Sequence, residues 1–313
     1  NNEQFRLLIK KLGVQEPSPI DNIRNQLKEL DQKGCTSLLT TIIKYSNSCD
    51  DVDSDELFKL MRKQLTLCCK TVNSSNDEND ITWCSVDKII VDSPILIEYY
   101  TLSGLKDKHY INRDYYRETI EIVGEKKFNN FLEELKFQSF PKIVLDRTSL
   151  KKEERDTRPK GYNSVTKDVY TFEGLKTVLE NIDSTDTPKE LSHFIWDALL
   201  DTINNNKLIF VNDRRTYFYY KSHTYIWKSC TLVEWLRNYN WLYVNDELLS
   251  IEDGVYREDL ISELYRYNEI LFTKLCIENS PNVTERETIK QMSEETQEAF
   301  SLFPNNNPHK FFS

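Results

Sequence analysis

The sequence predicts an α+β fold in which mostly helical units are interrupted by small antiparallel sheets. Apolar residues recur at helical spacing along most of the chain, for example in residues 36–47. Runs of aromatic and β-branched residues, which are typical of strands, gather near residues 81–100 and near residues 207–245. Three helix ends also share one hydrophobic pattern, which indicates a degenerate internal repeat.

Length and composition favour a globular protein. The 313 residues are enough for two domains, and 39% of them are hydrophobic and 29% charged. No apolar run approaches the roughly 18–20 residues of a transmembrane helix, so we expect no membrane partner. The net charge of −10 argues against binding nucleic acid over the whole surface, although a local basic patch remains compatible with it. The chain begins Asn1-Asn2 without a signal peptide, and we expect a fragment of a longer polypeptide.

The cysteines indicate a reducing compartment. There are seven, an odd number, and none has the CxxC spacing of a metal or redox motif. Most lie in apolar surroundings, which favours buried, reduced thiols in a cytoplasmic, intracellular protein. The adjacent Cys68 and Cys69 are interpreted as helix packing rather than redox chemistry.

The first expected unit covers residues 1–145 and is helical, with a small sheet led by Trp83. Its helices are expected where apolar residues return every three or four positions, at 5–12, 18–30, 36–47, 55–69 and 112–136. The last of these helices is expected to break near Gly124. Its strand-like runs are 81–86, 89–91 and 143–145.

Residues 146–168 are expected to be a linker or mobile loop, because they are charged and polar and have little periodicity. A second α+β unit, residues 169–313, is centred on 207–245. Its expected strands are a hairpin of aromatic strands and a strand led by Trp241. Five helices are expected: one at 171–182, one that starts at a capping box at Thr187, one that starts at a capping box at Thr231, one at 255–276, and a charged helix from Glu285.

The repeat is carried by helix ends. Each copy has an apolar helix, a residue that ends it, a hydrophobic residue and then a proline-marked turn. The three copies are Leu12-Gly13-Val14 before Pro17, Leu135-Lys136-Phe137 before Pro141, and Leu275-Cys276-Ile277 before Pro281. Generic helix ends would give the same pattern, so chance similarity stays open as an alternative.

Familiar catalytic and cofactor motifs are missing from the sequence. It has no GxSxG, HExxH or GxxxxGK motif, and its four histidines lack metal-ligand spacing. Residues 51–55 begin like a calcium loop, but the required Gly and Glu are replaced by Glu56 and Arg62, which favours a helix cap. We therefore expect no enzyme in this fragment, no cofactor and no catalytic, cofactor-binding or metal-binding residues.

Two basic segments are candidates for contact with a partner or with nucleic acid. Residues 146–160 hold six Lys and Arg against four Asp and Glu, and residues 214–228 interleave basic with aromatic side chains that would stack on single-stranded bases. A solvated loop and a hairpin packed in a core explain these segments equally well. The candidate contact residues are Lys151, Lys152, Arg155, Arg158, Lys160, Arg214, Arg215, Tyr217 and Tyr219.

The order of these motifs resembles the region downstream of the ATPase in sacsin-like proteins, which include the plant "no vein" proteins and bacterial defence proteins. The similarity is diffuse and rests on the helix ending Leu12-Gly13-Val14, the strand from Trp83, the Leu135-Lys136-Phe137 unit and the run from Thr231 into Trp241-Leu242. Tyr243 departs from the family, which often has proline after Trp-Leu. The residues of the family's GHKL-type nucleotide site have no match here.

The resemblance implies a non-catalytic structural and interaction module of a larger ATPase-coupled chaperone-like or defence protein. Such a module would recognise a client protein or other domains of the same polypeptide. The alternative, from the basic and aromatic residues of 146–160 and 214–228, is a nucleic-acid-binding module.

Overall fold

The structure, a computed structural model, describes residues 23, 35–46, 51–72, 81–150, 160–161, 163–205, 210, 213–219, 222–227, 230–260 and 264–281. The chain divides into two compact units between Phe140 and Pro141. Helices and small antiparallel sheets occur in both, so the fold is α+β, as predicted. The helices expected at 5–12, at 18–30 except for Ile23, and from Glu285 lie outside the described residues.

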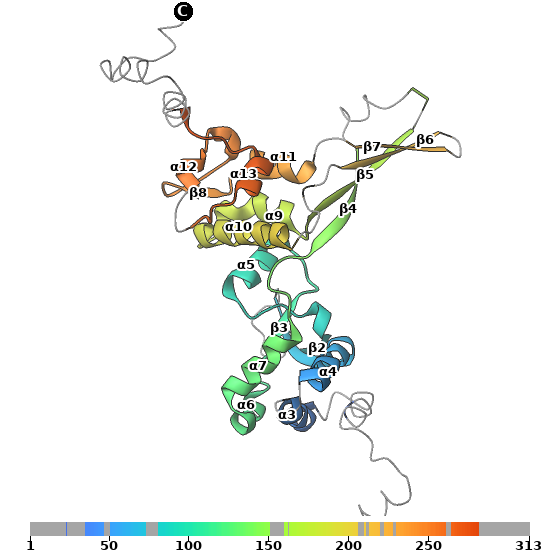
Figure 1. The fold of residues 1–313 in the computed structure, drawn as a ribbon, viewed down its shortest axis with the longest axis vertical. Coiled ribbons are helices and arrows are strands. Elements are labelled where there is room, and N and C mark those ends of the chain that lie inside the picture. The colour runs from blue at the N-terminus through green and yellow to red at the C-terminus, as the bar shows by residue number, and fades with distance from the viewer. Residues whose placement is uncertain are drawn as a thin grey trace, which may run out of the picture. The chain divides into compact units, whose positions relative to one another are not determined.

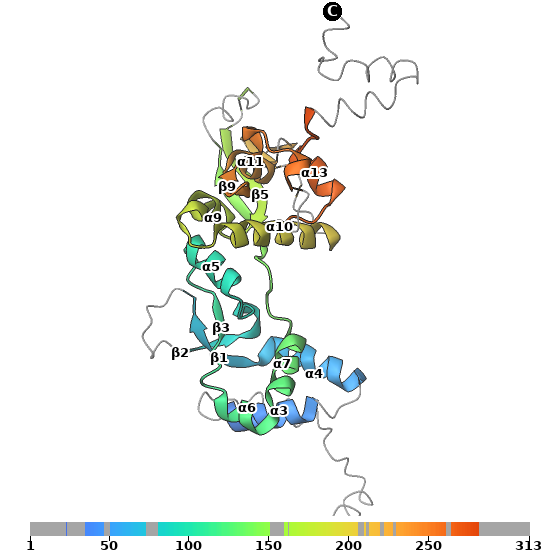
Figure 2. The ribbon, with the colours of Figure 1, turned by 90° about the vertical axis from the view of Figure 1, so that its left-hand side faces the viewer.

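Unit 1 combines helices with a three-stranded antiparallel sheet of order β2-β1-β3. The helices α6 and α7 pack on α3 and α4 (Figures 1 and 2). Parallel bridges from Ile89 to His109 and from Ile90 to Gln138 continue the sheet from β3 towards the end of α7. In chain order the elements are α3 (Cys35–Ser46), α4 (Asp51–Gln64), β1 (Thr66–Thr71), β2 (Ile81–Ser85), α5 (Pro94–Ser103), β3 (His109–Ile111), α6 (Arg117–Val123) and α7 (Glu125–Leu135).

The core of unit 1 explains one wrong prediction. The helix expected at 55–69 ends at Gln64, and its last residues belong instead to β1, the central strand. Leu67, Cys68 and Cys69 are all buried, because β1 has strands on both sides and is covered on both faces. Such a strand is a continuous apolar run, which periodicity alone does not separate from a buried helix.

Unit 2 contains a four-stranded antiparallel sheet of order β4-β5-β6-β7 and a two-stranded sheet, β8-β9. For β6 and β7 the structure describes the backbone alone. The helix α11 packs on β5, α13 and η3, while α10 packs on β8 and α13. In chain order the elements are β4 (Ile143–Ser149), β5 (Asn163–Phe172), α9 (Leu175–Asn181), α10 (Pro188–Asn204), β6 (Arg214–Tyr219), β7 (Ser222–Trp227), α11 (Thr231–Asn238), β8 (Leu242–Val244), β9 (Glu247–Leu249), η3 (Ile251–Asp253), α12 (Arg257–Leu260) and α13 (Glu269–Leu275).

Both ends of the linker expected at 146–168 are strand rather than loop, while its residues 151–159 and 162 lie outside the described residues. Residues 143–149 and 163–172 are the paired strands β4 and β5, seen as the green arrows in Figure 1. The charged residues that indicated a solvated loop include Lys167 and Asp168, which are buried. Each has an oppositely charged partner, and pairing of this kind allows charged side chains to lie inside a fold.

Two further elements of unit 2 are shorter than predicted. The helix expected at 171–182 starts at Leu175, because residues 171 and 172 complete β5. Of the helix expected at 255–276, the described residues contain α12 and α13 at its two ends, whereas residues 264–268 between them are not helical. In contrast, the aromatic hairpin of β6 and β7 and the helix that follows Thr187 are confirmed.

Two tryptophans form the centre of unit 2. Trp196 of α10 and Trp241 are fully buried, with ring centroids 6.4 Å apart. The indole N–H groups donate to the carbonyl oxygens of Arg266 and Leu236, at 3.1 and 2.7 Å, so neither buried donor is left unsatisfied. Trp235, in contrast, is only half-buried.

The two described copies of the repeated helix end have the same backbone geometry. Lys136, which ends α7, has φ 55° and ψ 54°, and Cys276, which ends α13, has φ 56° and ψ 41°. Both are left-handed caps formed without glycine, a conformation that costs an ordinary residue about 1–2 kcal/mol. The third copy, around Gly13, lies outside the described residues.

Candidate functional site

The basic contact residues expected from the sequence are only partly described. Lys151, Lys152, Arg155 and Arg158 lie outside the described residues, and Lys160 is exposed in a turn before β5. Arg214, Arg215, Tyr217 and Tyr219 lie in β6, where the structure describes the backbone.

The strand β6 is an inner strand of its sheet, with β5 on one side and β7 on the other. Its register sets Arg214 opposite Asp168 and Arg215 opposite Lys167 on β5. Tyr217 lies opposite Ser164 on β5 and Thr224 on β7. The hairpin therefore holds its basic and aromatic residues in a regular sheet rather than in a free loop.

A cleft of about 470 Å³ lies in unit 1, at a place that the sequence did not indicate. One wall is a face of α7, where Asn129, Leu132, Glu133 and Lys136 follow helical spacing. The opposite face of α7 buries Phe128, Phe131 and Leu135 in the core, which fixes the orientation of the helix. The wall therefore stands on a rigid element.

The other wall comes from the sheet and the segment that extends it. It consists of Val91, Asp92, Ile111 and Arg113. Arg113 joins the two walls, because its guanidinium donates to Asn129 Oδ1 on α7 at 3.0 Å and lies 3.6 Å from Asp92 Oδ2. Its side chain is still 42% exposed, so the ion pair is weak and the guanidinium has N–H groups left for a ligand.

The cleft has both apolar and charged lining. Leu132 and Phe137 are half-buried, and Val91 is 38% exposed. Arg113 and Lys136 supply positive charge, while Asp92 and Glu133 supply negative charge. Such a surface offers apolar contact together with donors and acceptors of both signs, as sites for peptides and small organic ligands do.

A tight turn fixes the position of Arg113. Asn112 is buried, its backbone N–H donates to the Cys68 carbonyl at 3.1 Å, and its side-chain oxygen accepts from the Tyr115 N–H at 3.3 Å. The next turn is closed by Tyr116, whose hydroxyl accepts from the Cys68 N–H at 2.7 Å. These bonds hold the residues after β3 against β1, and with them the backbone of Arg113.

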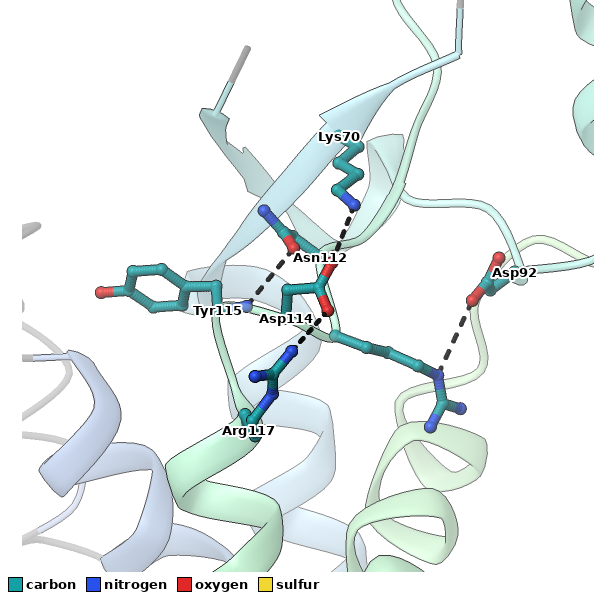
Figure 3. A network of polar contacts seen from close by, with 7 residues as sticks. Lys70, Asp92, Asn112, Asp114, Tyr115 and Arg117 are labelled. Carbon is teal, nitrogen blue, oxygen red and sulfur yellow. Dashed lines mark hydrogen bonds and ion pairs between the residues drawn. The ribbon is translucent and has the colours of Figure 1, made fainter. Parts of the chain in front are cut away.

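Asp114 ties the same turn to its two neighbouring elements. Figure 3 shows Lys70 of β1 and Arg117 of α6 reaching the two oxygens of its carboxylate, at 3.1 and 3.3 Å. The hydrogen bond and charge of Lys70, and after them the hydrogen bond of Arg117, lower the pKa of the Asp114 carboxyl below its ordinary value. All three side chains are exposed, so the network orients the turn more than it stabilises the unit.

Unit 2 contains a buried polar cluster of Lys167, Asp213 and Thr231. The ammonium of Lys167 donates to the Thr231 hydroxyl at 2.7 Å and lies 3.4 Å from Asp213 Oδ2. Asp213 accepts from both the Thr231 hydroxyl and the Thr231 backbone N–H, the latter at 3.0 Å. The side chains of Lys167 and Asp213 are 6% and 1% exposed, so the cluster is closed to solvent and joins β5, the residue before β6 and α11.

The same cluster explains how α11 begins. The predicted box had Thr231 as the helix cap, but the cap position is Cys230, which precedes the first turn. Asp213, from a distant segment, supplies the carboxylate that accepts the orphan N–H of Thr231. Burial raises the pKa of the Cys230 thiol, and the nearby carboxylate of Asp213 acts in the same direction.

The cleft residues and the buried cluster were not identified as sites from the sequence. Spacing alone places Asn129 and Glu133 on one side of a helix, but only the fold brings Arg113 and Asp92 against them. Lys167 and Asp213 lie far apart in the chain, and no local motif marks their contact.

Two searches of the structure and three comparisons with known proteins bear on the site. Within the part of the chain that the structure describes, no group of three or more His, Cys, Asp or Glu is arranged to hold a metal ion. Among the helices of the described residues, none has the length and apolar character needed to span a membrane. Comparisons with protein-family models, with curated proteins and with solved structures find no match.

Proposed function

We propose that the chain is a non-catalytic interaction module that recognises a peptide segment of a client or partner protein. The cleft of unit 1 is the observation that supports this proposal. It combines apolar lining residues, charges of both signs and a guanidinium with spare donors, and these match the side chains and the main chain of an extended peptide.

The experiment selects peptides from a random phage-displayed library on the whole chain and measures the best of them by calorimetry. We expect Leu132→Asp and Arg113→Ala each to weaken binding at least about tenfold, or roughly 1.4 kcal/mol. Ile122→Asp is the matched control, because Ile122 is 52% exposed on α6 and does not line the cleft. Enrichment of no peptide, or equal loss in the control, would overturn the proposal.

The wider context that we propose is a sacsin-like protein whose GHKL-type ATPase module lies outside this chain. The module would then transmit or receive conformational change from that ATPase. We expect the chain itself neither to bind nor to hydrolyse ATP, and saturable ATP binding in calorimetry would contradict this. A GHKL nucleotide signature encoded ahead of Asn1 is the expected result of sequencing the complete gene.

A second candidate function is binding of single-stranded nucleic acid through β6. The observation that favours it is the regular sheet in which Arg214, Arg215, Tyr217 and Tyr219 lie. Fluorescence anisotropy with single-stranded DNA tests it, with the double change Arg214→Ala and Arg215→Ala. An affinity that falls steeply with salt and with this double change supports the function, whereas equal binding by the variant and the parent chain excludes it.

A further inference from the structure

Two cysteine side chains come together on one face of the unit 1 sheet. In the register of β1 and β2, Leu67 lies opposite Cys84, and Cys69 lies opposite Thr82. Residues opposite each other or two apart share a face of a sheet, so Cys69 and Cys84 are diagonal neighbours on the same face. The Cys69 thiol donates to the Leu67 carbonyl oxygen at 3.4 Å, and the Cys84 side chain is the neighbour that shifts its pKa most.

The surroundings make the two sulfurs chemically unequal. The neighbouring Cys69 side chain lowers the pKa of the Cys84 thiol to about 7. The Thr82 side chain and the charge of Lys88 act in the same direction, although burial opposes the shift. The same contact with Cys84 and burial raise the pKa of the Cys69 thiol. One sulfur is therefore readily a thiolate near neutral pH, and the other stays a thiol beside it.

Access to the pair is narrow. Cys69 is 0% exposed and Cys84 is 5% exposed. Cys68, the neighbour of Cys69, is also buried but lies opposite Trp83 and so belongs to the other face of the sheet. A small oxidant would reach this site most easily at Cys84, and Cys69 is then the thiol in contact with the product.

We propose that Cys69 and Cys84 are an oxidation site, a dithiol that hydrogen peroxide or another small hydroperoxide converts into a disulfide between β1 and β2. The Cys84 thiolate attacks one peroxide oxygen, the O–O bond breaks, and hydroxide leaves and takes up the proton that Cys84 released, giving a sulfenic acid and water. The Cys69 sulfur then attacks the Cys84 sulfur. The S–O bond breaks, and the departing hydroxyl leaves as water with the Cys69 proton. Two thiols lose two electrons in total, and hydrogen peroxide is reduced to two waters.

The test treats the folded, reduced chain with hydrogen peroxide, blocks the remaining thiols by alkylation and maps linked peptides by mass spectrometry. We expect a linkage between Cys69 and Cys84 that forms without denaturant and disappears on reduction. Cys68→Ser should leave this linkage in place, and so should Cys276→Ser, which removes an exposed thiol. In Cys69→Ser the reaction should stop at a sulfenic acid on Cys84, which dimedone traps.

If a serine variant fails to fold, the linked peptides mapped from the oxidised parent chain are sufficient to test the proposal. A linkage of Cys84 to Cys68 would overturn the proposal. So would oxidation confined to other cysteines while circular dichroism reports a folded chain, or a Cys69–Cys84 linkage that appears only in urea.

Discussion

Removing the Asp213 carboxylate is expected to destabilise unit 2 strongly. In Asp213→Ala the ammonium of Lys167 stays buried but loses the carboxylate of Asp213, and the Thr231 N–H loses its acceptor. Breaking a buried ion pair from one side costs about 3–5 kcal/mol, a large part of the roughly 5–15 kcal/mol that stabilises a typical domain. With a urea dependence of about 1–3 kcal/mol per M, the unfolding midpoint should fall by at least about 1 M.

A second change tests the reason for this loss. If the cost comes mainly from the buried Lys167 ammonium that has lost the Asp213 carboxylate, adding Lys167→Met to Asp213→Ala should restore part of the stability, because methionine is apolar and of similar length. The double variant should therefore be more stable than Asp213→Ala alone. Thr231→Val, which removes only the hydroxyl, should cost less, about 1–3 kcal/mol.

Tryptophan fluorescence during urea unfolding suits this measurement. One of the five tryptophans, Trp83, lies in unit 1, and the other four lie in unit 2, so the signal reports mainly on the unit that is changed. A midpoint shift below about 0.3 M for Asp213→Ala would refute the reasoning, since it corresponds to less than about 1 kcal/mol. A double variant less stable than the single variant would refute it as well.

Three more outcomes are expected. Lys136→Gly should raise the stability of unit 1 by about 1 kcal/mol in urea unfolding, because glycine accepts the left-handed cap, whereas Lys127→Gly inside α7 should lower it by about as much. Trp196→Ala should cost about 3–5 kcal/mol by circular dichroism, and a cost below about 1 kcal/mol would contradict its central place in the core. In an NMR titration the Asp114 carboxyl should show a lowered pKa that Lys70→Ala moves back up. The pKa of the Asp114 carboxyl is lower in the folded chain than in the unfolded chain. The stabilisation that this carboxylate contributes is therefore fully present above the unfolded pKa and is lost as pH falls through the folded pKa.

Where a local signal exists, the sequence predicted the structure well. Gly124, at φ 88°, separates α6 from α7 as the break in the pattern indicated, and α10 begins at Pro188 just after the predicted Thr187. The aromatic hairpin was likewise found, because the alternation of side chains in β6 and β7 is a local feature.

The errors occurred where tertiary contacts override the local pattern. The strand β1 was mistaken for helix because its neighbours on both sides make every position of Leu67 to Cys69 buried. The strand β5 was mistaken for a linker because Lys167 and Asp168 look solvated until Asp213 and Arg147 are placed beside them. The cleft was missed for the same reason, since its two walls come from segments that only the fold brings together.

The order of the four-stranded sheet has a consequence for the kinetics of folding. Strands β4 and β5, and strands β6 and β7, are neighbours in sequence, but β5 and β6 meet only after α9 and α10 have intervened. Closing that long loop costs conformational entropy before its contacts form, which places the contact between Lys167 and Asp213 late in folding. An interaction that is absent from the folding transition state changes the unfolding rate and leaves the folding rate almost unchanged. This buried pair should therefore govern how slowly unit 2 unfolds rather than how fast it folds.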